Sequence, residues 1–74
     1  MILLLLGTDA CHLCDDAKLL LERLNVPVTY LDITIHPEWI HFAMHIPVLY
    51  HVPTQRYLSW PFDATAIFSF INSL

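Results

Sequence analysis

The first 33 residues carry a strand–helix–strand pattern, which limits the possible folds more than any other feature of the chain. Residues 2–6 are a continuous apolar run, typical of a central strand that is covered on both faces. Residues 28–33 are rich in β-branched and aromatic side chains and predict a second strand. Residues 11–24 predict an amphipathic helix, because apolar side chains recur at steps of three and four; these are Leu13, Ala17, Leu20, Leu21 and Leu24. Two strands joined through a helix run parallel, with a right-handed crossover.

Signals at both ends of this predicted helix support its boundaries. Thr8 or Asp9 is expected to cap the first turn. Asn25 is expected to take the left-handed conformation after the last turn, and Pro27 prevents the helix from continuing.

The second half of the chain predicts a short helix, a hairpin and a last helix. Pro37 suits a first helical turn, and a short helix there would carry apolar side chains toward the sheet, namely Trp39, Ile40, Phe42 and Ala43. Residues 46–52 and 57–60 predict an antiparallel hairpin, with residues 53–55 as its turn. Asp63 is expected to cap a last helix, which would pack through Ile67, Phe68, Phe70, Ile71 and Leu74.

The predicted element order is therefore βαβαββα within one domain, residues 1–74. Helices on both faces of a four-stranded mixed sheet would give a three-layer α/β/α fold of the thioredoxin type. The chain is 57% hydrophobic, which supplies a dense core for so short a domain.

Charge and cysteine usage argue against several classes of protein. The chain has seven acidic and three basic residues and a net charge of −4, whereas nucleic-acid binding favours basic patches. No apolar run approaches the roughly 20 residues of a membrane-spanning helix, and residues 1–6 lack the cationic start of a signal peptide. The two cysteines are too close in sequence to connect distant loops. We therefore expect a monomer in the reducing cytoplasm, with no membrane partner.

Cys11 and Cys14 stand where the first predicted strand meets the first predicted helix. A helix N-terminus carries roughly half a positive charge and unpaired N–H donors, which stabilise a thiolate. A separation of three residues places both sulfurs on one side of one turn, close enough to bridge. The pattern indicates redox or metal chemistry, with two ordinary buried cysteines as the simpler alternative. Asp15 and Asp16 suit a first helical turn, but their charges oppose thiolate formation.

Three segments, taken in order, resemble one family over essentially the whole chain. TDACHLCD (residues 8–15), IPVL (residues 46–49) and WPFD (residues 60–63) resemble the short bacterial glutaredoxin-like proteins of the thioredoxin fold, whose function is largely uncharacterised.

This resemblance implies roles for four residues. Cys11 would be the nucleophile that attacks a disulfide, and Cys14 would resolve the mixed disulfide. The Ile46-Pro47 bond would be cis and would turn the backbone of Ile46 toward a substrate chain, with which it could pair as an exposed strand edge does. The expected partner is a disulfide-containing protein or a small thiol substrate.

The chain departs from the family pattern where glutathione would bind. Glutaredoxins that bind glutathione usually have Lys or Arg just ahead of the first cysteine and Gly-Gly before the last helix. Here Asp9-Ala10 and Pro61-Phe62 stand in those places. Only the N–H groups of the helix after Asp63 remain as an anion site. No cofactor is predicted, and the use of glutathione as reductant is left open.

Three further residues are candidates for the site. His12 would lower the pKa of the nucleophile if it were charged, or would be an ordinary exposed side chain. Trp60 and Asp63 could line a groove, although core packing and helix capping explain them as well. No metal site is predicted, because the five histidines lack zinc-ligand spacing; they are His12, His36, His41, His45 and His51.

The predicted function is enzymatic: a thiol–disulfide oxidoreductase that cycles Cys11 and Cys14 on protein or low-molecular-weight disulfides. Two alternatives stay open. A Cu(I) or zinc carrier would use the same cysteine pair, but such proteins usually carry methionine where Asp9 stands and end on a strand. A redox-inert binding module on the same fold is the other.

Overall fold

One four-stranded mixed sheet organises the chain, and the structure, a computed structural model, describes residues 2–74. The elements in chain order are β1 (Leu3–Gly7), α1 (His12–Arg23), β2 (Thr29–Asp32), the short 3₁₀ segments η1 (Ile33–Ile35) and η2 (Pro37–Phe42), β3 (Val48–His51), β4 (Arg56–Ser59) and α2 (Ala64–Asn72). This is the predicted βαβαββα order, with 3₁₀ segments in the place of the middle helix.

The strands lie in the order β2-β1-β3-β4. β1 pairs with β2 in parallel, as the strand–helix–strand pattern predicts, and Leu5 lies opposite Tyr30. β1 also pairs antiparallel with β3, with Leu6 opposite Val48, and β3 forms the predicted antiparallel hairpin with β4. β1 is therefore an inner strand, and its C-terminal end leads into the loop that carries the two cysteines.

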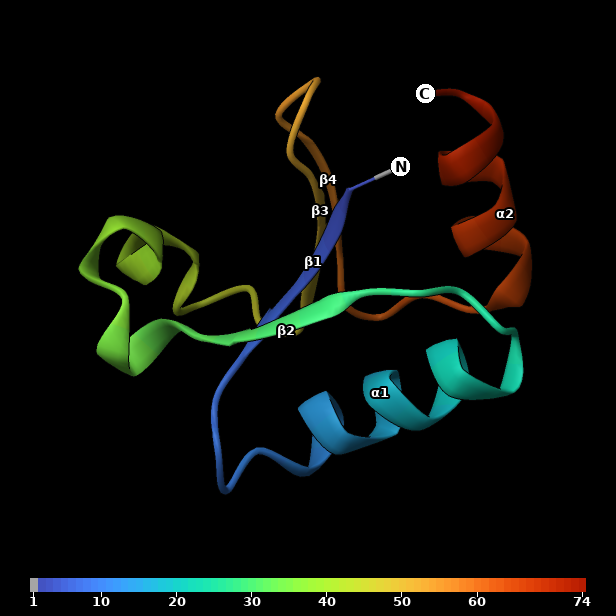
Figure 1. Cartoon of the computed structure of the whole chain (residues 1–74). Coiled ribbons are helices and arrows are strands. Elements are labelled where there is room, and N and C mark those ends of the chain that lie inside the picture. Colours follow the sequence, from blue (N-terminus) through green and yellow to red (C-terminus); the bar gives the residue numbers. More distant parts are fainter. Residues whose placement is uncertain (1) are drawn as a thin grey trace.

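Alternate side chains of β1 point into two separate cores. Leu3 and Leu5 pack with residues of α1 and α2 in one buried cluster, and Leu6 packs with Ile33 and Phe42 in the other. Figure 1 shows α1 and α2 on one side of the sheet and the 3₁₀ segments on the other. The strand is covered on both faces, as expected, but both α-helices share one face.

The segment predicted as a short α-helix is the 3₁₀ segment η2. Side chains three residues apart share a face in a 3₁₀ helix, and the rings of Trp39 and Phe42 lie there with centroids 6.3 Å apart. Phe42 is buried, whereas Ile40 is exposed, contrary to the prediction that it faces the sheet. A 3₁₀ form is common in connecting segments as short as these six residues.

The ends of the helices are partly as predicted. Asn25 has a φ of 56°, the expected left-handed value, and the Asp63 carboxylate caps α2 by accepting a hydrogen bond from the Ala66 N–H at 2.8 Å. The predicted cap of α1 by Thr8 or Asp9 is wrong, because Cys11 is the residue that caps it.

Besides Ile40, four side chains predicted to pack are exposed instead: Leu13, Ala43, Phe68 and Leu74. Leu13 lies between the two cysteines, in the first turn of α1, ahead of the buried residues Ala17 and Leu21. In the part of the chain that the structure describes, no helix combines the length and the apolar character needed to span a membrane.

Candidate functional site

The two cysteines form a disulfide at the start of α1, with their Cα atoms 5.3 Å apart. The Cys11 Sγ accepts a hydrogen bond from the Cys14 N–H at 3.3 Å, so the sulfur of Cys11 meets the positive end of the helix dipole. Cys11 is half-buried, and Cys14 is 0% exposed. Cys11 is thus partly accessible to solvent, whereas Cys14 is covered by protein.

The loop that carries this pair turns sharply just before Cys11. Ala10 has a φ of 59°, a value that is uncommon for a residue other than glycine. The side chains of His12 and Leu13 follow and are both exposed. They lie at the surface beside the half-buried Cys11.

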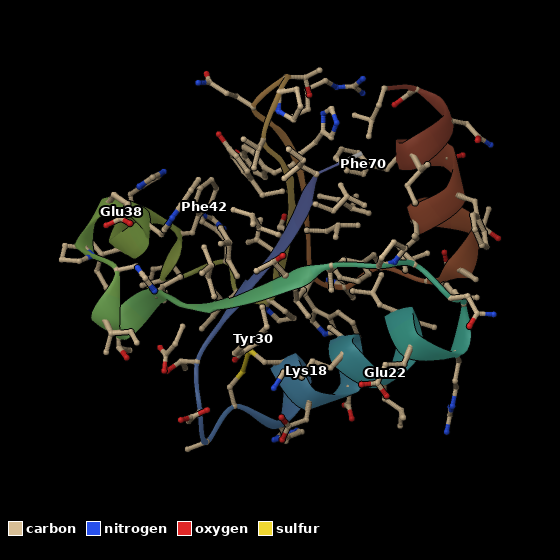
Figure 2. All side chains as sticks on the ribbon, in the orientation of Figure 1. Lys18, Glu22, Tyr30, Glu38, Phe42 and Phe70 are labelled. Atoms are coloured by element: carbon tan, nitrogen blue, oxygen red, sulfur yellow. A yellow bond between two sulfur atoms is a disulfide. The ribbon has the colours of Figure 1, made fainter. Side chains whose placement is uncertain are left out.

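Cys14 packs against the end of β1 at Gly7. A Cβ on Gly7 would stand 3.0 Å from the Cys14 Sγ and 2.9 Å from the hydroxyl oxygen of Tyr30. The absence of a side chain at Gly7 therefore leaves room for both groups. Figure 2 shows Tyr30 beside the yellow sulfur atoms.

Tyr30 is held over the first turns of α1. The Lys18 Nζ lies 3.8 Å from the centroid of the Tyr30 ring, which is a cation–π contact. Burial raises the pKa of Tyr30 above its usual range, and the charges of Asp32, Asp9 and Asp15 raise it further. The hydroxyl of Tyr30 therefore keeps its proton and is available as a hydrogen-bond donor.

Asp32 ends β2 and connects it to η1. Its carboxylate accepts hydrogen bonds from the hydroxyl and the backbone N–H of Thr34, at 2.7 and 2.9 Å. These bonds hold the pKa of Asp32 below its usual range, and smaller contributions come from Thr8 and the backbone of Asp9. The loop before Cys11 therefore lies close to this carboxylate.

The Ile46-Pro47 bond is cis, which confirms the prediction, and the Trp60-Pro61 bond is cis as well. The Pro47 carbonyl accepts a hydrogen bond from the Trp60 N–H at 3.0 Å, so the two segments lie side by side. Leu6 pairs with Val48, and one further step along both strands sets Gly7 beside Pro47. Pro47 therefore stands at the end of β1 that leads to the cysteines, with its side chain buried.

Trp60 contributes to core packing, and Asp63 caps α2. The rings of Trp60 and Phe62 meet edge to face, with centroids 5.0 Å apart, and Trp60 packs against the core between the sheet and the helices. An open hollow of about 410 Å³ lies beside them, lined by Pro61, Phe62, Asp63 and Ala66. The N–H of Ala66 in the predicted anion site already bonds to the Asp63 carboxylate.

The histidines lie in three regions of the fold: His12 on α1, His51 on β3, and the remaining three on or beside η2, namely His36, His41 and His45. His51 is buried, and its Nδ1 lies 2.7 Å from the Thr54 hydroxyl in the β3–β4 turn. His36 lies 3.6 Å from the carboxylate of Glu38 at the start of η2. Within residues 2–74, His, Cys, Asp and Glu side chains form no group of three or more that could hold a metal ion.

The sequence reasoning missed Gly7, Tyr30 and Lys18. One signal points to the first of them: Gly7 is the only glycine in the chain, and the structure places it at the end of β1 rather than in the turn that follows. A glycine inside a strand often marks a close approach of another group. Tyr30 and Lys18 follow from Gly7 only once the pairing of β1 with β2 and the packing of α1 are known.

Comparison with known proteins agrees with this arrangement. The family model of the glutaredoxin-like domain (DUF836) matches residues 2–72. The crystal structure of the structural genomics target XcR50 from X. campestris is 30% identical, covers 97% of each chain and superposes with a TM-score of 0.84. Its solution structure, also 30% identical, covers 100% of this chain and 96% of its own, with a TM-score of 0.79.

A second protein of known structure shares the fold at lower identity. The solution structure of Ne2328 from Nitrosomonas europaea is 21% identical, covers 93% of this chain and 88% of its own, and gives a TM-score of 0.77. No curated protein matches the chain.

Proposed function

We propose that this chain, which belongs to the glutaredoxin-like domain family, is a thiol–disulfide oxidoreductase that cycles Cys11 and Cys14. The observation that carries the proposal is the disulfide between these residues at the N-terminus of α1. Cys11 is partly exposed and Cys14 is buried. A thiolate at a helix N-terminus is both stabilised and nucleophilic.

In the reductive direction, the Cys11 thiolate attacks one sulfur of a substrate disulfide and forms a mixed disulfide. The other substrate sulfur leaves as a thiolate. Cys14 then attacks the Cys11 Sγ, the Cys11–Cys14 bond forms, and the second substrate thiolate is released. The two electrons gained by the substrate come from the two cysteine thiols.

We assign Ile46 and Pro47 to substrate positioning. The Pro47 carbonyl is used by Trp60, so pairing with a substrate chain falls to the backbone N–H and C=O of Ile46. An extended peptide that passes Ile46 would pair through these groups, as strands do at a sheet edge. The substrates we propose are disulfides in proteins or small molecules, and the proposed compartment is the reducing cytoplasm.

The test compares the wild type with two single variants on a small disulfide, hydroxyethyl disulfide, and on a disulfide-bonded peptide. Cys11→Ser is expected to abolish reduction of both. Cys14→Ser is expected to attack but not to release, so mass spectrometry should find it as a stable mixed disulfide with half of the substrate. Wild-type protein that reduces neither substrate, and a Cys14→Ser variant that traps nothing, would refute the proposal.

The same preparation tests the metal-carrier alternative. If the reduced wild type bound one Cu(I) ion tightly and reduced no disulfide, the cysteine pair would be a metal site. A protein with neither property would be a redox-inert binding module.

A further inference from the structure

The buried sulfur of Cys14 poses a chemical problem for the resolving step. Cys14 is 0% exposed, and burial in apolar surroundings raises the pKa of a thiol, so that less of the attacking thiolate forms. The Cys14 side chain therefore needs a hydrogen-bond donor or a positive charge that favours its charged form.

The carboxylates around Cys14 do not supply it. Asp9 in the preceding loop, Asp15 on α1 and Asp32 on β2 act on the neighbouring Tyr30 hydroxyl, whose pKa they raise. Negative charge opposes a thiolate at the same place in the same way that it opposes a phenolate. Two nearby groups would favour a thiolate at Cys14: the ammonium of Lys18 and the hydroxyl of Tyr30.

Gly7 shows that the Tyr30 hydroxyl is built into this place. The chain has a single glycine, and it does not have a positive φ, so the backbone conformation does not require it. A strand glycine weakens its strand by roughly 0.5–1 kcal/mol relative to alanine. What the absence of a side chain provides here is the space shared by the Cys14 Sγ and the Tyr30 hydroxyl.

The Tyr30 ring is also held in position from three sides. Its backbone pairs with Leu5 of β1, its ring packs against the core beneath α1, and the Lys18 ammonium lies over its face at 3.8 Å. Figure 2 shows Tyr30 and Lys18 together at the end of α1 that bears the cysteines. The fold thus fixes the Tyr30 ring, with its hydroxyl on the same side of Gly7 as the Cys14 Sγ.

We propose that the Tyr30 hydroxyl donates a hydrogen bond to the Cys14 thiolate and so sustains the resolving attack. This inference rests on the proposed function. In the step it supports, Cys14 loses its proton to solvent, its thiolate attacks the Cys11 Sγ, and the bond from Cys11 to the substrate sulfur breaks. The substrate sulfur leaves as a thiolate and takes up a proton from solvent, and Tyr30 keeps its own proton throughout.

The first experiment measures the pKa of Cys14 without any substrate. In a reduced Cys11→Ser background, the ¹³Cβ chemical shift of Cys14 is followed against pH. Tyr30→Phe keeps the ring and removes only the hydroxyl, and it is expected to raise the pKa of Cys14 by about one unit. Tyr57→Phe is the matched control, because Tyr57 lies on β4 at the opposite edge of the sheet; it should leave the pKa of Cys14 unchanged.

A second change keeps the test valid if Tyr30→Phe does not fold. With Tyr50 and Tyr57 replaced by phenylalanine, Tyr30 is the remaining tyrosine of the three and can be labelled with 3-fluorotyrosine, a stronger donor of nearly the same shape. The label should lower the pKa of Cys14. A Cys14 pKa that moves in the opposite direction, or stays constant in both variants, would overturn the inference.

The kinetic experiment separates this inference from the proposed function. With a mixed disulfide preformed on Cys11, Tyr30→Phe should slow release of the second thiol about threefold, because the tenfold loss of thiolate is partly offset by the higher nucleophilicity of a more basic thiolate. The first attack by Cys11 should keep its rate. A wild type that reduces no disulfide would remove the proposed function and leave the pKa result standing, whereas an active wild type with unaltered release in Tyr30→Phe would remove the inference alone.

Discussion

Gly7, the single glycine of the chain, lies against both Cys14 and Tyr30. In an ordinary strand, Gly7→Ala would add roughly 0.5–1 kcal/mol of stability. Here the new Cβ would stand 2.9 Å from the Tyr30 hydroxyl, 3.0 Å from the Cys14 Sγ and 3.2 Å from the Cys14 Cβ. We therefore predict that Gly7→Ala lowers the free energy of unfolding of the oxidised protein by about 1–3 kcal/mol, the usual range for overpacking. Urea denaturation measures it.

A double-mutant cycle is the control for this prediction. Tyr30→Phe removes one of the two groups that the new Cβ would meet, so Gly7→Ala should cost less in the Tyr30→Phe background than in the wild type. Equal costs in both backgrounds would mean that Tyr30 does not occupy the space beside Gly7.

Asp32 gives a prediction about pH at the same scale. Hydrogen bonds from Thr34 hold the pKa of Asp32 below its ordinary value of 3.8. A carboxylate with a lowered pKa contributes stability above the ordinary value and loses it as the pH falls through the folded value. Acid titration of the urea midpoint should therefore show a loss of stability below pH 3.8, and the loss should be smaller in Asp32→Asn. Thr34→Ala should reduce this acid-induced loss of stability in part. If both variants lost as much stability at acid pH as the wild type, the lowered pKa of Asp32 would be contradicted.

At the scale of elements, the Asp63 cap of α2 can be tested directly. The Asp63 carboxylate accepts the Ala66 N–H at 2.8 Å, and loss of such a cap costs about 0.5–2 kcal/mol. Asp63→Ala is expected to lower the free energy of unfolding by that amount, measured by urea denaturation. Asp63→Asn keeps an acceptor and should lose less, so equal losses in the two variants would show that charge rather than capping is what matters.

The elements also show how far the sequence could predict the fold. Periodicity identified α1 and α2, and the β-branched runs identified the strands, because these signals are local. The 3₁₀ form of η2 was missed, since apolar residues at steps of three fit a short α-helix and a 3₁₀ helix alike. The placement of both α-helices on one face of the sheet depends on packing between distant elements, which the pattern of a single element does not contain.

The sequence likewise predicted some residues of the candidate site and missed others. Cys11 and Cys14 could be found from their spacing, and the cis Ile46-Pro47 bond followed from the family resemblance. Tyr30 could not be predicted as a site residue from the sequence, because a single tyrosine in a strand is usually explained by core packing. Its proximity to Cys14 depends on the pairing of β1 with β2 and on the crossover through α1.

At the scale of the whole molecule, the two cores fix the relation between the cysteine loop and the sheet. One core locks α1 against β1 through Ala17 and Leu21, and the other locks η1 and η2 against the opposite face. The N-terminus of α1 and the segment around Pro47 are thereby both anchored to β1, the strand that contributes to both cores. The cysteine loop connects two packed elements, which keeps the two sulfurs in place through a reaction that makes and breaks the bond between them.

The last prediction concerns the choice of substrate and follows from the acidic character of the protein, whose net charge is −4. Asp9, Asp15 and Asp32 act on Tyr30 beside the disulfide, so an approaching anion is repelled and a cation attracted. Three disulfides of similar size carry different charges: cystamine is cationic, hydroxyethyl disulfide neutral and dithiodiglycolate anionic. We predict that the reduced protein reacts fastest with cystamine and slowest with dithiodiglycolate. At low salt, the second-order rate constant should fall about severalfold from cystamine to hydroxyethyl disulfide and again from hydroxyethyl disulfide to dithiodiglycolate.

Salt and two variants separate this electrostatic effect from the intrinsic reactivity of the three disulfides. Added salt shortens the screening length to about 8 Å at physiological ionic strength, so the spread of second-order rate constants should narrow. Asp9→Asn should narrow the spread at low salt as well, whereas Glu38→Gln, on η2 across the sheet from α1 (Figure 2), should not. If the three rate constants kept the same ratio at every salt concentration, the acidic surroundings would have no part in selecting the substrate. The preference against anions would otherwise apply to glutathione, whose net charge is negative, and would favour a neutral or cationic thiol as reductant.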